Sequence, residues 1–350
     1  MPPAAVNRQV VIDRVPEARL SAADFTVRSG AVPVPESGRA LCRTLLLSLD
    51  PVNRSLMRSG GDYRGGLAPG DVMAGFAVAE VLRAADTGGP PMGALVFGET
   101  GWQEYAAVDI DQLIPVPGLG PLTHQLSVLG VTGMTAWFGL REIGRPRPGE
   151  TVVVSAAAGA TGSVAVQLAA LAGCRVVGIV GSEPKAEVVR ELGADAAVLR
   201  AEPRELRARL RDACPSGIDV YFDTVGGPVL DACLPLMRAH GRVVCCGALS
   251  AYDAAEPPPG PRGVPGLIVS KRLRMEGFVV LDHAADWPEA QTALAGFVER
   301  GEMTVLEEVV EGLEHAPEAF VGVLAGGNIG KRMVRVAAPS EAPLTAAASA

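Results

Sequence analysis

A turn of small residues, Ala157-Ala158-Gly159-Ala160-Thr161-Gly162, is the stretch of this sequence best suited to chemistry. It matches the dinucleotide-binding fingerprint with the first glycine replaced by alanine. In that fingerprint Gly159 lets the backbone approach a pyrophosphate, and Gly162 lets the next helix pack closely on the strand. The helix would turn its free N–H groups and positive dipole end toward the phosphates. Small-residue turns also precede helices in α/β folds that bind no nucleotide, so the turn alone leaves both interpretations open.

The residues after the second apolar strand bear on the choice of cofactor. An NAD site places Asp or Glu at the tip of this strand, about 20 residues past the glycines, where it binds the ribose 2′-OH. Here the strand ends Val180-Gly181-Ser182, and Glu183 already lies in the first turn of a helix, where an acid is favourable. The missing carboxylate favours NADPH over NADH.

A βαβ unit over residues 151–182 must position these groups. Its two strands are unbroken Val- and Ile-rich runs, as in parallel strands that are covered on both faces. The same alternation continues downstream, which predicts a doubly wound parallel sheet. The expected helices are 184–192, 203–213, 229–239 and 287–300, and the expected strands are 196–199, 218–223, 241–247 and 273–280, with a proline-rich loop at 253–266.

The first 120 residues have a different pattern, with short strands expected at 7–13, 39–49, 72–82, 94–98 and 102–108. Turn residues separate these strands, as in an all-β domain. A helix is expected from 126 to before Arg145, and a helix at 316–324 and a strand at 332–336 can return to the first domain. The predicted domains are therefore a β-rich domain over 1–128 and 301–338, a Rossmann domain over 129–300, and a disordered tail over 339–350.

The composition excludes several classes of function. The chain has 350 residues, 48% of them hydrophobic, and a formal net charge of −8, which argues against a nucleic-acid partner. No secretory apolar segment begins the chain, and the apolar stretch at 151–181 is broken by glycines, so we expect a cytoplasmic protein without a membrane span. Six scattered cysteines include no C-x-x-C pair, which predicts reduced thiols and no zinc knuckle.

Segments along nearly the whole chain share the pattern of one known family, namely 48–51, 133–140, 150–162, 178–185, 221–227, 246–252, 274–280 and 327–331. The chain resembles the zinc-independent medium-chain dehydrogenases/reductases, in the alkenal/one oxidoreductase group that includes prostaglandin reductase (leukotriene B4 12-hydroxydehydrogenase). The resemblance implies a Rossmann domain inserted into a β-rich, GroES-like catalytic domain, and typically a homodimer. It also implies NADPH-dependent reduction of the C=C bond of α,β-unsaturated ketones or aldehydes.

The sequence also argues against catalytic zinc. Zinc-dependent relatives carry Gly-His-Glu near the end of the catalytic domain, whereas the comparable stretch here, Gly75-Phe76-Ala77-Val78-Ala79-Glu80, has no histidine. Catalytic zinc needs three protein ligands and an open position. The four histidines, at positions 124, 240, 283 and 315, lie far apart in the sequence, so no metal is expected.

The resemblance assigns roles to individual residues. Tyr252 is the family tyrosine beside nicotinamide and substrate carbonyl, and its phenol can donate a hydrogen bond to a developing enolate. Lys185 matches the family's lysine for the 2′-phosphate, and Arg200 stands where the family has a tyrosine beside that phosphate. The implied cofactor-binding residues are Gly159, Ala160, Thr161, Gly162, Ser182, Lys185, Arg200, Thr224, Cys246, Gly247, Ala248, Tyr252, Phe278, Val279, Val280 and Asn328.

Each of the three polar assignments has a simpler structural alternative. Lys185 can be a solvated lysine on a helix surface, and Arg200 a surface arginine before a helix. Tyr252 can be a loop tyrosine packed under the proline-rich segment. The nicotinamide ribose 2′-OH is a second candidate donor to the enolate oxygen, so Tyr252 need not be indispensable.

Two departures from the family pattern concern the pocket. Val52 replaces a family tyrosine that often lines the substrate pocket, and Thr224 replaces an asparagine near the nicotinamide ribose. Both changes suggest that the cofactor mode is retained in a different pocket. The alternatives to a small-enone reductase are a quinone reductase, a biosynthetic enoyl reductase acting on a bulkier intermediate, and a non-catalytic NADPH-binding protein.

Overall fold

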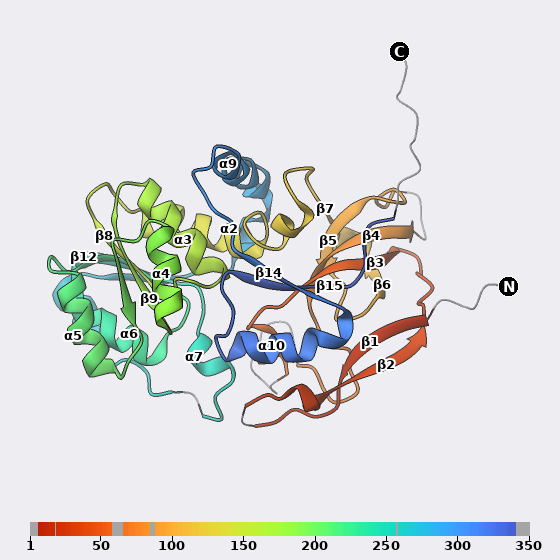
Figure 1. The fold of residues 1–350 in the computed structure, drawn as a ribbon, viewed down its shortest axis with the longest axis horizontal. Helices are drawn as coiled ribbons and strands as arrows, with labels where there is room; N and C mark the ends of the chain where they lie inside the picture. The colour runs from red at the N-terminus through yellow and green to blue at the C-terminus, as the bar shows by residue number, and fades with distance from the viewer. Residues whose placement is uncertain (1–5, 18, 58–65, 85–87, 257, 341–350) are drawn as a thin grey trace, which may run out of the picture.

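The computed structural model describes residues 6–17, 19–57, 66–84, 88–256 and 258–340. The chain forms two units that lie side by side along the long axis of the molecule (Figure 1). The parallel-sheet unit holds strands β8 to β13 with helices α2 to α9, and the mixed-sheet unit holds the other strands with α1 and α10. None of the helices in the described ranges combines the length and apolar content that crossing a membrane requires.

All strand pairs of the parallel-sheet unit are parallel, in the order β10-β9-β8-β11-β12-β13. In β8, Val152 and Val154 pack in the core on one face of the sheet, and Val153 packs in the core on the other. Because helices cover both faces, every position of a central strand favours an apolar residue. The strands are β8 (Thr151–Val154), β9 (Arg175–Val180), β10 (Ala196–Leu199), β11 (Ile218–Asp223), β12 (Met237–Cys245) and β13 (Arg274–Gly277).

Helices α2, α3, α4 and α9 supply the core on one face of this sheet, and α5 and α6 supply the core on the other. The last turns of α2 widen into a π-helix over Gly139–Gly144. The helices of this unit are α2 (Val131–Phe138), α3 (Ala160–Leu171), α4 (Glu183–Glu191), α5 (Pro203–Ala213), α6 (Gly227–Cys233), α7 (Leu249–Tyr252), α8 (Val264–Lys271) and α9 (Trp287–Glu299).

The mixed-sheet unit contains both ends of the described chain. The seven strands run β14-β15-β3-β4-β5-β7, with β6 paired to β3, and β1 and β2 form a separate antiparallel ribbon. Figure 1 shows the C-terminal strands β14 and β15, in blue, beside the orange-red β3. The elements are β1 (Val6–Ile12), β2 (Phe25–Ala31), β3 (Arg39–Ser48), α1 (Asn53–Leu56), β4 (Phe76–Ala84), β5 (Leu95–Glu99), β6 (Tyr105–Asp109), β7 (Ile114–Pro115), β14 (Glu307–Glu311), α10 (Ala316–Leu324) and β15 (Lys331–Arg335).

Trp102 is the centre of the core that joins the two ends of the chain. It is fully buried, stacks on Phe25 with ring centroids 5.6 Å apart, and meets the edge of Phe320 in α10 at 5.3 Å.

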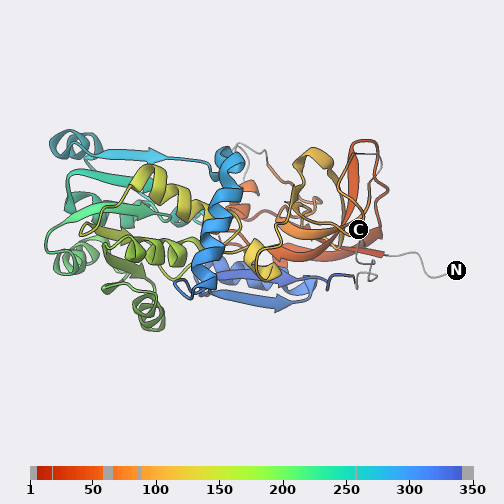
Figure 2. The same cartoon turned by 90° about the horizontal axis from the view of Figure 1, so that it is seen from above.

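The order of the elements shows how the two units are connected. The chain leaves the mixed-sheet unit after β7, builds the parallel-sheet unit, and returns through β14, α10 and β15, as Figure 2 also shows. The predicted fold class, a Rossmann-type unit inserted into a β-rich unit, is confirmed.

The structure corrects several predicted elements. The helix expected over 229–239 ends at Cys233, because Pro235 has no backbone N–H to continue it, and β12 already begins at Met237. Helix α8 begins within the expected loop 253–266, with a proline in its first turn, where its missing N–H is harmless. The strand expected over 273–280 is only Arg274–Gly277, and strand β2 was not predicted. The predicted tail 339–350 lies outside the described residues from 341 onward.

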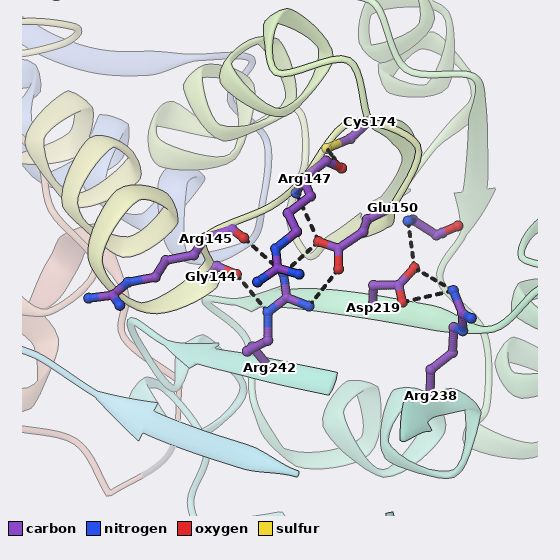
Figure 3. Close-up of polar contacts among 9 residues, drawn as sticks. Gly144, Arg145, Arg147, Glu150, Cys174, Asp219, Arg238 and Arg242 are labelled. Carbon is purple, nitrogen blue, oxygen red and sulfur yellow. Dashed lines mark hydrogen bonds and ion pairs between the residues drawn. The ribbon is translucent and has the colours of Figure 1, made fainter. Parts of the chain in front are cut away.

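An arginine–glutamate clamp fixes the loop that enters β8 (Figure 3). The Arg242 guanidinium of β12 pairs with both carboxylate oxygens of Glu150 and donates from Nε to the carbonyl of Gly144 at 2.8 Å. The backbone N–H of Arg147 also donates to Glu150, at 2.8 Å. Burial alone would raise the pKa of Glu150, but the hydrogen bonds from Arg242 and Arg147 outweigh it, so this pKa lies below its usual value.

We expect the clamp to stabilise the fold without entering the chemistry. Arg242→Met should lower the free energy of unfolding at pH 7 by about 1.5–3 kcal/mol, the range for a hydrogen bond to a charged group. Because the folded-state pKa of Glu150 is depressed, its contribution is present above the ordinary glutamate pKa of about 4.3 and is lost as the pH falls through the folded-state value. Urea unfolding at pH 7 and at pH 3.5 should therefore show a smaller difference between variant and unmodified protein at the lower pH.

The matched control is Arg300→Met, which removes an exposed pair with Glu302 at the end of α9. Exposed pairs contribute little, so this variant should unfold like the unmodified protein. If Arg242→Met and Arg300→Met lower the free energy of unfolding equally, the pair of Arg242 and Glu150 has no special stabilising role.

Candidate active site

The glycine turn after β8 is tight and leaves helix N–H groups available. Gly159 is the N-cap of α3, and no side chain in the described part of the chain caps the helix. A Cβ at Gly162 would lie 2.3 Å from the carbonyl oxygen of Ala156, and one at Gly159 would lie 3.1 Å from the same atom. The turn thus has the small-residue cradle, and the open first-turn N–H groups of Ala160 and Thr161, that a pyrophosphate requires.

A loop of the mixed-sheet unit, residues 326–330, lies directly on this turn. The N–H of Gly330 donates to the carbonyl of Ala158 at 2.8 Å, and Gly159 and Gly330 form an isolated parallel bridge. Asn328 supports the loop by donating from Nδ2 to the carbonyl of Gly330 at 2.7 Å. The predicted residue Asn328 is therefore beside the glycine turn although 166 positions separate it from Gly162.

A basic cluster lies where the second strand of the sheet ends. Lys185 in α4 donates from Nζ to the carbonyl of Gly326 at 2.7 Å. Arg200 follows β10, and its N–H donates to the carbonyl of Val180 at the tip of β9. Burial lowers the pKa of Lys185. The nearby positive charges of Arg332 and Arg200 act in the same direction, and the carboxylate of Glu308 acts against them.

Asp223 at the end of β11 fixes the backbone that leads away from the strand. The carboxylate is buried and accepts hydrogen bonds from the N–H groups of Val225 and Gly226, at 3.0 and 2.9 Å. The Tyr221 hydroxyl donates to the same oxygen at 2.8 Å. Burial raises the pKa of Asp223, and these hydrogen bonds partly offset that rise. The side chain is thus a structural acceptor.

Thr224 contacts Ser155, which lies just before the glycine turn and which the sequence did not indicate as a site residue. Its N–H donates to Ser155 Oγ at 2.8 Å, and the two hydroxyl oxygens are 3.3 Å apart. Ser155 lies between the valines of β8 and the small-residue turn, a polar residue in an otherwise apolar stretch that could have drawn attention. The hydroxyl joins the ends of β8 and β11.

The residues after β12 bring Tyr252 to the same edge. Cys246 N–H donates to the carbonyl of Asp223 at 2.8 Å, and Leu249 N–H donates to that of Thr224 at 3.1 Å. The N–H of Ala248 donates to the Tyr252 hydroxyl at 3.2 Å, and a Cβ at Gly247 would lie 3.4 Å from that hydroxyl. Parallel strands end at one edge, which is why these segments meet.

The segment after β13 is only partly open. A Cβ added at Gly139 would lie 3.2 Å from the ring of Phe278, and that ring meets His283 edge-on at 6.2 Å. Val279 is 38% exposed, whereas Val280 is buried in the core with α2 and α9. Val280 is thus placed as a core side chain, unlike Val279.

Known proteins are similar to this chain in sequence and in fold. Residues 8–116 match the N-terminal domain of oxidoreductase, and residues 160–296 match the family described as zinc-binding dehydrogenase. A 2-alkenal reductase (NADP(+)-dependent) of Nicotiana tabacum is 38% identical over 94% of this chain and 97% of its own. An NADPH-dependent curcumin reductase of Escherichia coli is 37% identical over 95% and 97%. The crystal structure of CurA from Vibrio vulnificus in complex with NADPH superposes with a TM-score of 0.88 at 35% identity, covering 95% and 100%.

The chain belongs to the medium-chain dehydrogenases/reductases. Within this family it belongs with the NADP-dependent reductases, as the resemblance predicted. The residues present fit such a dinucleotide, since an added Cβ at Gly159 or Gly162 would crowd the turn, and β9 ends beside two basic residues without a carboxylate at its tip. Among the described residues of this reductase, no three His, Cys, Asp or Glu side chains are grouped closely enough to hold a metal ion.

We expect Lys185 to select NADPH. Lys185→Ala should weaken NADPH binding by about 1.5–3 kcal/mol, the range for a hydrogen bond to a charged group, and leave NADH binding nearly unchanged. Titration of the protein with each dinucleotide, followed by protein fluorescence, gives both dissociation constants.

Lys271→Ala is the matched control. Lys271 also donates to backbone carbonyls, those of Pro235 and Met237, and burial lowers its pKa as well, but it lies at the end of α8. The Lys271→Ala substitution should leave the dissociation constants of NADPH and NADH unchanged. Tight NADH binding by the unmodified protein would contradict the assignment of Lys185.

Proposed function

We propose that this protein uses NADPH to reduce the C=C bond of an α,β-unsaturated ketone or aldehyde, by hydride transfer to the β-carbon and without zinc. The observation that carries the proposal is the single sheet edge that holds the glycine turn, Lys185 and the Tyr252 hydroxyl. The alkenal and curcumin reductases that this chain resembles support the same reaction class. NADPH supplies the hydride when bound, and the chain supplies the binding and the hydrogen-bond donor.

Tyr252 is proposed as the donor to the oxygen that becomes an enolate. Its hydroxyl oxygen accepts the N–H of Ala248, and this contact leaves the phenolic hydrogen available to point at a substrate. A donor placed before the reaction stabilises the negative charge as it develops on the carbonyl oxygen. Thr224 and Ser155 are proposed to hold the neighbouring wall of the site through their hydroxyl groups.

The direct test is NADPH oxidation with a panel of enones, enals and a quinone, followed by mass identification of the product. The proposal expects a product two hydrogens heavier than the enone, with the carbonyl intact. Because Val52 replaces the family tyrosine, we expect the preferred enone to differ from those of relatives that retain it. Reduction of the quinone alone would overturn the proposal.

The homodimer implied by the family stays a prediction that light scattering can measure.

The assigned donor predicts a defined kinetic change. Tyr252→Phe keeps the ring and removes only the hydroxyl, so kcat should fall while NADPH affinity barely changes. An oxyanion donor can contribute about 2.7–4 kcal/mol, or roughly 10²–10³ in rate, and we expect the lower end or less because the ribose hydroxyl is a second donor. Stopped-flow measurements with deuterated NADPH would establish that chemistry limits the rate. If the rate of Tyr252→Phe is unchanged under that condition, Tyr252 only lines the pocket and is not the donor.

Zinc independence gives a second, separate prediction. Protein purified in the presence of a chelator should contain no stoichiometric zinc and should keep its full activity, because the stretch 75–80 offers no histidine ligand and catalytic zinc needs three. Elemental analysis and the NADPH oxidation assay measure this. One zinc per chain, together with loss of activity on its removal, would refute the prediction.

A further inference from the structure

We propose that Arg54 and Asp253 form a positioning pair that holds Tyr252 in place from the opposite unit of the protein. This inference rests on the proposed function, because it assigns the support of the proposed donor. Arg54 belongs to α1 of the mixed-sheet unit, and Asp253 directly follows Tyr252 in the parallel-sheet unit. Their side chains meet although 199 positions separate them.

Several hydrogen bonds converge on this pair. Arg54 is fully buried, and its Nε donates to Asp253 Oδ1 at 2.9 Å. Its Nη2 donates to the carbonyl of Pro16 at 2.7 Å, and the same oxygen of Asp253 accepts the N–H of Leu20 at 3.0 Å. The pair thus joins α1, the segment that follows β1, and the residue next to the proposed donor.

The helix that carries Tyr252 is short, and backbone hydrogen bonds hold its first two residues. Leu249 N–H donates to the carbonyl of Thr224 at 3.1 Å, and Ser250 N–H donates to that of Val225 at 3.0 Å. α7 has only four residues, Leu249–Tyr252, none of them buried and none capped by a side chain. Segments with few buried contacts open locally at low free energy. The contact at Asp253 therefore adds a tether at the other end of α7, next to Tyr252.

Arg54, in contrast, is attached to a rigid part of the mixed-sheet unit. Its neighbour Asn53 donates to the carbonyl of Ala74 at 2.8 Å. Three positions before that, Asp50 pairs with the buried ammonium of Lys331 in β15. Lys331 follows Gly330, the residue that lies on the glycine turn.

These contacts form a continuous path from the glycine turn to Tyr252. The path leads from the glycine turn through Gly330, Lys331 and Asp50 to α1, and from Arg54 through Asp253 to Tyr252. A buried ion pair is a poor source of stability, since apolar residues of similar volume often replace it without loss. We therefore assign to this pair the role of positioning the Tyr252 hydroxyl relative to the cofactor site. A displacement of about 1 Å at such a site can lower a rate about 10²-fold.

A double-mutant cycle tests the inference. Asp253→Asn removes the charge and keeps an oxygen that can accept from Arg54, and it is measured alone and together with Tyr252→Phe. If the pair acts through Tyr252, Asp253→Asn lowers kcat by no more than Tyr252→Phe does, and it causes no further loss in the Tyr252→Phe protein. NADPH affinity stays unchanged in all four proteins. Losses in kcat that multiply would overturn the inference.

Amide hydrogen exchange gives a readout that does not depend on activity. Asp253→Asn should speed exchange of the amides over 248–253 and of Leu20, and leave α3 unchanged. Arg54→Lys, which keeps the charge but loses the forked guanidinium, should produce the same pattern and serves if Asp253→Asn does not fold. Arg242→Lys is the matched control, since it weakens a partly buried pair on another part of the parallel-sheet unit and should leave exchange over 248–253 as it is.

The two proposals fail in distinguishable ways. If the unmodified protein reduces no enone, the proposed function fails, while faster exchange over 248–253 in Asp253→Asn still supports the tether. If enones are reduced but exchange over 248–253 is the same in Asp253→Asn, Arg54→Lys and the unmodified protein, the tether is overturned and the reductase stands.

Discussion

The backbone contact between Gly330 and Ala158 is the constraint on which the arrangement of the two units depends. Gly159 and Gly330, which form the bridge at this contact, both lie close to neighbouring backbone, and a Cβ at Gly159 would lie 3.1 Å from the carbonyl oxygen of Ala156. Gly330 has a φ of +68°, and a Cβ there would lie 2.1 Å from the carbonyl oxygen of Leu306. The next residue, Lys331, is thereby directed into the mixed-sheet unit, where it pairs with Asp50. This contact thus joins a loop of one unit directly to the glycine turn of the other.

Local sequence patterns predicted the strands and turns whose conformation depends on residues close in the sequence. Val152, Val153 and Val154 are apolar because both faces of β8 are covered, and this run alone predicts a central parallel strand. The glycines that follow predict the tight turn, since the fingerprint describes backbone geometry. Helix α8 escaped prediction because the prolines and glycines around it indicate a loop, and its own first-turn proline does not oppose a helix.

The polar contacts that organise the site could not be predicted in this way. Ser155 and Thr224 are 69 positions apart, and Arg54 and Asp253 are 199 apart. No periodicity relates such pairs, because they meet only after the parallel sheet has assembled and the chain has returned to the first unit. The family resemblance supplied Lys185, Thr224 and Tyr252 as individual residues. It did not indicate the side chains that hold them.

Asp223 at the end of β11 and Asp253 directly after Tyr252 have the same task, and their partners show why. Asp223 receives two backbone N–H groups and a tyrosine hydroxyl on one oxygen, and these contacts fix the start of the loop that follows β11. Asp253 is engaged by a buried guanidinium and a backbone N–H from the other unit. Both carboxylates therefore serve as fixed acceptors. The phenol of Tyr252 differs, because its oxygen accepts from Ala248 while its hydrogen is left free by that contact, and this is the property that a donor to an enolate needs.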